Sequence, residues 1–234
     1  MTAPLVLAST SRYRIALLQR LGVPFEAVAP AFDEREHDHA LDSLGPAGLA
    51  LLLARGKARS LAPPAAPGTS PGPAATSSSQ RFAAAWVLAA DQVAVLGEGD
   101  PPRWRQLHKP GTHAAAVAQL LQLSGREHRL ITAVVLRHAG TGVEHEAVDE
   151  VVLHMRAFDR AEAQAYVDAF APLDCAGSYR IEDRGITLMR AIEARGPCGA
   201  DPTSIEGLPL LLTAQLLRRA GVLGPREPRS DPAP

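Results

Sequence analysis

A four-residue apolar run near the amino terminus, Leu5–Ala8, ends at three hydroxyl residues, and the chain then restarts as a helical pattern. Such a short run is typical of a buried strand, and Tyr13–Leu21 has the apolar spacing of a helix that ends at Gly22. The intervening Ser9–Arg14 carries hydroxyls that can cap the helix and arginines that can bind phosphate oxygens. With the free N–H groups of a helix start, this junction suits a polyphosphate, although many α/β proteins place Ser or Thr there.

The rest of the chain carries a mixture of strand and helix patterns. Strands and helices alternate early, whereas later strands are joined by hairpins, one through the turn Ala139–Gly142. This order favours an α/β protein with a mixed sheet over a purely parallel one. We expect Asp33–Asp42 to be a loop. The further strands are expected at Phe25–Ala29, Trp86–Ala90 (ending at Asp91-Gln92 and continued by Val93–Leu96), His128–His138, Val143–Arg156, Ala176–Ile181 and Ile186–Ile192, and the further helices at Gly48–Leu61, Thr112–Leu123, Arg160–Ala169 and Leu208–Ala220.

The length allows one large domain or two small ones, and we expect the protein to be cytoplasmic. The 234 residues carry a net charge of −1, which argues against a general nucleic-acid binder. No apolar run approaches a membrane span or a signal peptide, and the two cysteines are expected to be reduced thiols. We expect a single catalytic domain over residues 1–223, a flexible insertion at Pro63–Ser79 that is rich in Pro, Ala and Ser, and a disordered tail at 224–234.

Two carboxylates, Asp91 and Glu34, are candidate catalytic or metal-binding residues. Asp91 follows a buried apolar run, where it could hold a divalent cation, accept a proton from water, or simply form a turn. Glu34 follows the second expected strand and could equally be a solvated loop acid. The residues alone leave these alternatives open.

Two lysines could neutralise phosphate oxygens, although each could also be an ordinary solvated side chain. They are Lys57, near the end of an expected helix, and Lys109, which Pro110 restrains in extended backbone. The cluster His37–His39 is a weak metal candidate, because adjacent residues do not converge easily on one ion. The sequence contains no P-loop, no dinucleotide-binding glycine fingerprint and no GxSxG motif.

Nine short sequence stretches, taken in their order along the chain, resemble the Maf family of nucleoside triphosphate pyrophosphatases. The resemblance extends over almost the whole chain, from about Leu5 to Gly221. The resemblance implies a twisted mixed sheet like that of inosine triphosphate pyrophosphatases, elongated, with a cleft between two lobes. The matching stretches are Leu7–Arg14, Gly22–Glu26, Phe32–Glu34, Ala90–Gln92, His108–Pro110, Leu123–Gly125, Pro172–Ser178, Gly185–Leu188 and Gly207–Pro209.

The family divides by substrate, and this chain is similar to the branch that hydrolyses 7-methyl-GTP. Members with Ala-Asp-Thr at the strand end look like dTTP/UTP pyrophosphatases, whereas this chain has Gln92 after Asp91. By the same resemblance, Tyr13, Gln92 and Glu182 occupy the positions that set substrate choice. A cationic methylated guanine would favour an aromatic face and a nearby carboxylate.

The resemblance also implies the remaining roles. Asp91 is expected to activate water or, with Glu34, to bind Mg²⁺ or Mn²⁺ as the metal cofactor. The triphosphate is expected to contact Ser9, Ser11, Arg14, Lys57 and Lys109. We expect a nucleoside triphosphate as the substrate, neither nucleic acid nor membrane as a partner, and a homodimer as the assembly to test.

Three other functions stay open at this stage. They are a dTTP/UTP pyrophosphatase, a nucleotide-binding regulator of septum formation, and a catalytically inactive α/β protein. The chain also departs from the pattern of its branch: Arg12 replaces a proline, Glu206 replaces an apolar residue, and the segments Pro63–Ser79 and Gly196–Asp201 are longer than usual.

Overall fold

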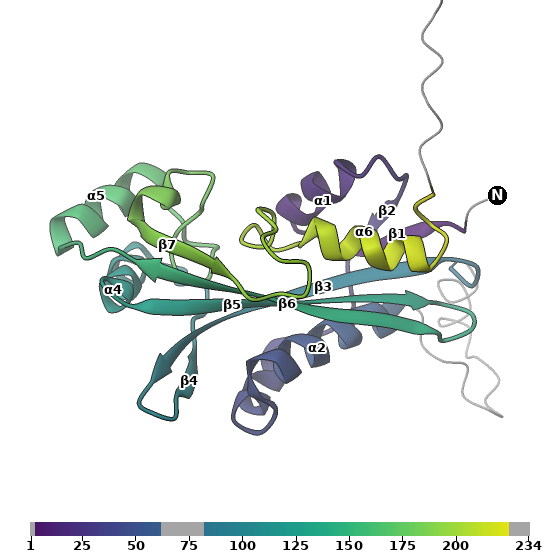
Figure 1. The fold of residues 1–234 in the computed structure, drawn as a ribbon, viewed down its shortest axis with the longest axis horizontal. Coiled ribbons are helices and arrows are strands. Elements are labelled where there is room, and N and C mark those ends of the chain that lie inside the picture. Colours follow the sequence, from purple (N-terminus) through teal and green to yellow (C-terminus); the bar gives the residue numbers. More distant parts are fainter. Residues whose placement is uncertain (1–2, 62–81, 225–234) are drawn as a thin grey trace, which may run out of the picture.

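Seven strands form one mixed sheet in the computed structural model, which describes residues 3–61 and 82–224 (Figure 1). The expected insertion Pro63–Ser79 and residues 225–234 of the expected tail lie outside the described residues. The strands are β1 (Leu5–Ala8), β2 (Glu26–Val28), β3 (Trp86–Glu98), β4 (Arg103–Gln106), β5 (Glu127–His138), β6 (Glu144–Met155) and β7 (Met189–Ala194).

The strand order confirms the predicted mixed sheet. The strands run β2-β1-β3-β5-β6-β7, and β4 pairs with β3 as a hairpin. β1 is parallel to β2 and β3, whereas β3, β5, β6 and β7 form an antiparallel series. The early alternation of strand and helix thus gives the parallel part, and the later hairpins give the antiparallel part.

Helices cover both faces of the sheet. Figure 1 shows α1 and α6 on one face and α2 on the other, with α4 and α5 together at the far end. Two short 3₁₀ helices complete the set. The bounds are α1 (Arg12–Gln19), η1 (Arg35–Ala40), α2 (Leu41–Leu61), α4 (His113–Leu123), α5 (Arg160–Phe170), η2 (Gly185–Leu188) and α6 (Leu210–Arg219).

The alternation of side chains along β1 and β3 divides the core between the two faces. Leu5 and Leu7 pack with α1 and α6, whereas Val6 and Ala8 pack with α2. Each fully buried Leu of this kind stabilises the fold by about 1.5–3 kcal/mol. None of the helices in the described ranges combines the length and apolar composition that a bilayer crossing requires.

The same alternation separates two neighbouring polar residues of β3. Val87, Ala89 and Val93 pack on the α2 face, so Asp91 points towards α2. Gln92 points to the opposite face, towards the loop that precedes α6. β1 ends at Ala8 while β3 continues well beyond it, which leaves room for a site at the carboxyl end of β1.

Three predicted elements need correction. The predicted continuation of the strand over Val93–Leu96 is confirmed, but the strand does not break at Asp91-Gln92. β3 is continuous from Trp86 to Glu98, and a lysine from α2 neutralises the buried Asp91. The segment Asp33–Asp42 is not a loop: η1 occupies most of it, and α2 begins at Leu41 with a kink at Gly45.

The third wrong element is the expected strand Ala176–Ile181, which is a series of turns. Gly177 and Ser178 both have positive φ angles, +87° and +61°, and a strand cannot contain such a pair. The following expected strand, Ile186–Ile192, is divided between η2 and β7. These turns form one wall of the cavity described next.

Candidate active site

A cavity of about 500 Å³ opens where β1 ends and α1 begins. It brings together nine of the ten site residues predicted from the sequence. They are Ser9, Ser11, Tyr13, Arg14, Glu34, Lys57, Gln92, Lys109 and Glu182. The tenth, Asp91, is buried directly behind Lys57 and does not line the cavity itself.

The two serines shape the start of α1. Ser11 is the N-cap residue, and its hydroxyl oxygen accepts a hydrogen bond from the Arg14 N–H at 3.5 Å. Ser9 is buried, and its hydroxyl oxygen accepts from the Ser11 N–H at 3.1 Å. Both hydroxyls keep their own proton to donate, and the first N–H groups of α1 have no partner within the helix. This end of the cavity therefore presents donors suited to an anion.

Two cations line the cavity with donors to spare. Arg14 donates from Nε to the carbonyl oxygen of Gly207 at 3.0 Å, and its terminal nitrogens form no hydrogen bond with any described residue. Lys109 is exposed, and within residues 3–61 and 82–224 it forms no hydrogen bond or ion pair. Both side chains can therefore bind phosphate oxygens without breaking an existing contact.

Lys57 lies between the two predicted acids. Its Nζ is 2.5 Å from Oδ1 of Asp91 and 2.7 Å from Oε1 of Glu34. Lys57 and Asp91 are each only 4% exposed, whereas the side chain of Glu34 is half-exposed. Gly56 allows this arrangement, because a Cβ there would lie 2.2 Å from the ring of Phe32, two residues before Glu34.

The pKa of Glu34 depends on its burial and on the cations near it. Partial burial, the largest single influence, raises it, but the charge and hydrogen bond of Lys57 together with the charges of Arg14 and Lys109 outweigh burial. The pKa of Glu34 is therefore held below its ordinary value. Three cations from distant parts of the chain thus surround a single carboxylate.

Gln92 has a fixed orientation in the cavity. Its Nε2 donates to Oγ1 of Thr132 at 2.9 Å and to the carbonyl oxygen of Ser204 at 2.7 Å. Both amide protons are thereby used, and this network assigns Oε1 as the free end of the amide. Gln92 therefore offers an acceptor to a ligand.

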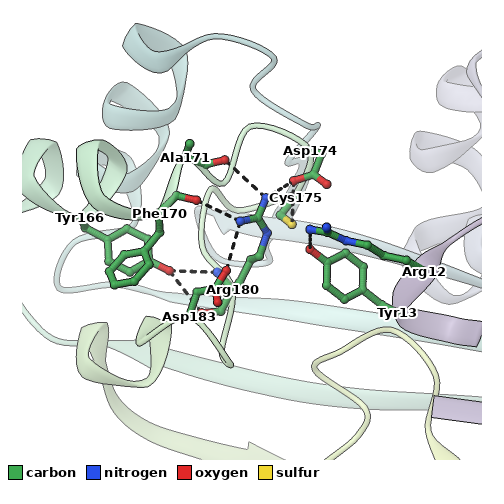
Figure 2. Close-up of polar contacts among 9 residues, drawn as sticks. All are labelled: Arg12, Tyr13, Tyr166, Phe170, Ala171, Asp174, Cys175, Arg180 and Asp183. Carbon is green, nitrogen blue, oxygen red and sulfur yellow. Dashed lines mark hydrogen bonds and ion pairs between the residues drawn. The ribbon is translucent and has the colours of Figure 1, made fainter. Parts of the chain in front are cut away.

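Tyr13 is the aromatic residue at the cavity mouth. Its hydroxyl accepts a hydrogen bond from Nη2 of Arg12 at 2.6 Å, and Cζ of Arg12 lies 4.8 Å from the ring centroid (Figure 2). Arg12, the residue found in place of a proline, is exposed and meets its neighbour's ring. The contact restrains the Tyr13 ring beside the cavity.

Arg180 holds the opposite wall together. Figure 2 shows its guanidinium reaching the carboxylates of Asp174 and Asp183 and the carbonyl oxygens of Phe170 and Ala171, which end α5. Its backbone N–H donates to the hydroxyl of Tyr166 at 3.0 Å, and that hydroxyl donates to the Arg180 carbonyl oxygen at 3.2 Å. One side chain therefore fixes a loop that has no regular ladder of backbone hydrogen bonds.

A buried pair supports the same wall from behind. The Tyr179 hydroxyl lies 2.7 Å from Nε2 of His128, and both side chains are almost completely buried. Burial lowers the pKa of His128 to about 4, with a smaller contribution from His154. His128 is therefore a neutral packing partner of Tyr179 at physiological pH.

Glu34 and Asp91 are the predicted metal ligands of the site. In the described part of the chain, no three His, Cys, Asp or Glu side chains come together as a metal-binding group. The ring of His37 stacks on Phe32 at a centroid separation of 5.0 Å. Glu34 and Asp91 both lie within hydrogen-bond distance of the same ammonium, so their oxygens are the available donors for a hard cation.

The sequence interpretation missed three residues of the site. Arg180 and Thr132 received no role, and Glu206 was noted only as a departure in local packing, whereas the structure places it on the cavity wall. Thr132 stands out as the one hydroxyl in the apolar run Leu130–Leu136 of β5, which was an available signal. The contacts of Arg180 depend on turns that apolar periodicity does not reveal.

Comparison with known proteins gives consistent matches. The family model described as Maf-like protein matches residues 4–220. A 7-methyl-GTP pyrophosphatase of Burkholderia lata is 40% identical over 220 residues, covering 92% of this chain and 89% of that protein. Proteins of the same name are 41% identical in Xanthomonas oryzae pv. oryzae (217 residues; 93% and 96% covered) and 37% identical in Albidiferax ferrireducens (218 residues; 93% and 94%).

Proposed function

The chain belongs to the Maf family, and from this premise we propose that it is a pyrophosphatase that hydrolyses 7-methyl-GTP to 7-methyl-GMP and pyrophosphate. The observation that carries the proposal is the cavity itself, whose lining combines phosphate donors with an aromatic ring, an amide oxygen and carboxylates. A nucleoside triphosphate needs both kinds of contact, one for its phosphates and one for its base. A role in removing modified nucleotides from the cytoplasmic pool would follow.

The cationic and hydroxyl side chains of the cavity would hold the triphosphate by charge and by hydrogen bonds. Arg14 and Lys109 have free donors, and Ser9 and Ser11 add hydroxyls at the start of α1. Lys57 would join them when its ammonium turns from the two carboxylates towards the cavity. Positioning and charge neutralisation account for most catalysis of phosphoryl transfer.

Cleavage would occur between the α- and β-phosphates. Water forms the new bond to the α-phosphorus, and the bond to the bridging oxygen breaks so that pyrophosphate leaves. Asp91 would accept the proton of the attacking water, which requires the ammonium of Lys57 to move away from Oδ1. Asp91 as a metal ligand is the alternative role for the same carboxylate.

The donor set fits a divalent cation. Glu34 and Asp91 would hold Mg²⁺ or Mn²⁺, because carboxylate oxygens are the ligands that such hard ions prefer. The ion would supply charge neutralisation at the phosphate oxygens. Calorimetric titration of Mn²⁺ into the wild type and into Glu34→Gln tests this part without any turnover.

The decisive experiment measures pyrophosphate release from a nucleotide panel: 7-methyl-GTP, GTP, dTTP and UTP, each with Mg²⁺, Mn²⁺ or a chelator. We expect the highest kcat/KM for 7-methyl-GTP and loss of turnover with the chelator. Preference for dTTP or UTP would replace the proposed substrate. Binding of nucleotides without release of pyrophosphate would overturn the enzymatic proposal in favour of a nucleotide-binding regulator.

A further inference from the structure

The side chain of Glu206 lies in the cavity wall and has no hydrogen-bond or ion-pair partner among the described residues. It lies in the loop before α6, where another acid, Asp201, is fully occupied: its oxygens accept from the N–H groups of Thr203 and Leu211 at 2.9 and 2.7 Å. The carboxylate of Glu206, by contrast, forms no hydrogen bond and no ion pair within residues 3–61 and 82–224, and it lines the cavity. The side chain of Asp201, and not that of Glu206, therefore holds this loop.

A second carboxylate, that of Glu182, also lines the cavity. Glu182 comes from the turns after Arg180, is exposed, and likewise has no hydrogen-bond or ion-pair partner among the described residues. The two acids affect each other, since burial and then the charge of Glu182 raise the pKa of Glu206, while Arg20 opposes the shift. Arg20 is outside the cavity lining.

Two of the cations that line the cavity are held by other contacts. Arg180 is neutralised by Asp174 and Asp183, and the Arg12 guanidinium donates to the hydroxyl of Tyr13. The amide of Gln92 presents only its oxygen. Glu182, Glu206 and Gln92 therefore offer acceptors and negative charge to a ligand.

From this arrangement we propose that Glu206 is a specificity-determining residue which, with Glu182, selects nucleotides whose base carries a positive charge. The inference rests on the proposed function and deepens it. Methylation at N7 gives guanine a positive imidazole ring, and its other edge carries N–H donors for carboxylate or amide oxygens. A neutral base with the same triphosphate lacks the charge, so the two acids discriminate through the base alone.

The test compares two substrates that differ only in the methyl group. In Glu206→Gln, the ratio of kcat/KM for 7-methyl-GTP to that for GTP should fall about tenfold, as expected for loss of one charge-assisted contact. Glu206→Asp, which retains the charge, should recover part of the ratio. Glu98→Gln removes an exposed carboxylate at the β3–β4 hairpin, outside the cavity lining, and serves as the matched control whose ratio stays at the wild-type value.

Binding separates this inference from the proposed function. Calorimetry with 7-methyl-GMP and GMP needs no turnover, so it measures base preference even if no pyrophosphate is released. Weaker binding of 7-methyl-GMP relative to GMP in Glu206→Gln supports the inference. An unchanged ratio, or an equal loss for both nucleotides, would overturn it and would leave pyrophosphate release in the wild type as a separate result.

Discussion

Nζ of Lys57 lies 2.5 Å from Oδ1 of Asp91, and the two buried side chains come from opposite sides of the boundary between α2 and the sheet. The pair therefore bears on stability and, through the general-base role proposed for Asp91, on catalysis. A third partner, Glu34, connects the pair to the open cavity.

Replacing Asp91 with Asn should lower kcat by about a hundredfold or more, because general-base catalysis commonly contributes a factor of that size. Asn retains the shape and an acceptor oxygen for Lys57, so the protein should remain folded. Steady-state pyrophosphate release gives the rate, and circular dichroism checks the fold. Wild-type turnover in a folded variant would remove Asp91 from the mechanism.

Replacing Lys57 with Met should lower the free energy of unfolding by about 3–5 kcal/mol at neutral pH, since it leaves a buried carboxylate without its partner. Urea titration measures the change. The double variant Lys57→Met/Asp91→Asn should recover much of the loss, because it no longer buries an unpaired charge. Equal stability of wild type and Lys57→Met would show that the pair contributes nothing net.

Replacing Gln92 with Thr should shift preference from 7-methyl-GTP towards dTTP or UTP, on the order of tenfold in the ratio of kcat/KM. The change removes the amide oxygen and leaves the Ser204 carbonyl without its donor. Thr132→Val is the graded control, since it keeps Gln92 but releases one amide proton. An unchanged nucleotide ranking in Gln92→Thr would show that Gln92 does not contact the base.

Replacing Arg180 with Lys should raise KM for the nucleotide about tenfold while kcat changes little, because an ammonium cannot span two carboxylates and two carbonyl oxygens. Arg180 acts here as a positioning residue for the cavity wall. Arg195→Lys is the matched control, because Arg195 forms an ion pair with Glu193 on the exposed surface. A fall in kcat at constant KM would instead assign Arg180 to the chemical step.

His128 should make stability depend on pH between 6.5 and about 4, its ordinary and its buried pKa. As the pH falls through this range, the unfolded chain binds a proton that the buried ring does not, so the folded state loses about 3 kcal/mol. Urea titrations across the range should show a shallower pH dependence for His128→Gln, which can keep a hydrogen bond to Tyr179. Parallel profiles would contradict the assignment.

Local patterns predicted most of the fold. The apolar runs at β1, β5 and β6 and the N-cap Thr112 of α4 lie where the sequence placed them, because burial and capping leave a periodic signal. The interruption at Asp91 misled the prediction of β3. A charged residue within a strand looks like a boundary unless its partner is known, and Lys57 is 34 residues away.

The sequence predicted which residues line the site better than it predicted the contacts among them. Nine of the predicted residues line one cavity, but Lys57, expected to contact phosphate, is paired with two acids. The orientation of Gln92 and the freedom of Glu206 depend on contacts across the fold. Such contacts are set by tertiary packing, which short motifs do not encode.

The hydrogen bond from Arg14 to the carbonyl oxygen of Gly207 joins residues 193 positions apart. During synthesis the chain emerges from its amino terminus, so Arg14 is made long before the carbonyl oxygen that holds its guanidinium. A nascent or truncated chain that stops before Gly207 would contain all ten predicted site residues, but Arg14 would lack this anchor. Completion of the cavity therefore waits for the carboxyl-terminal part of the chain.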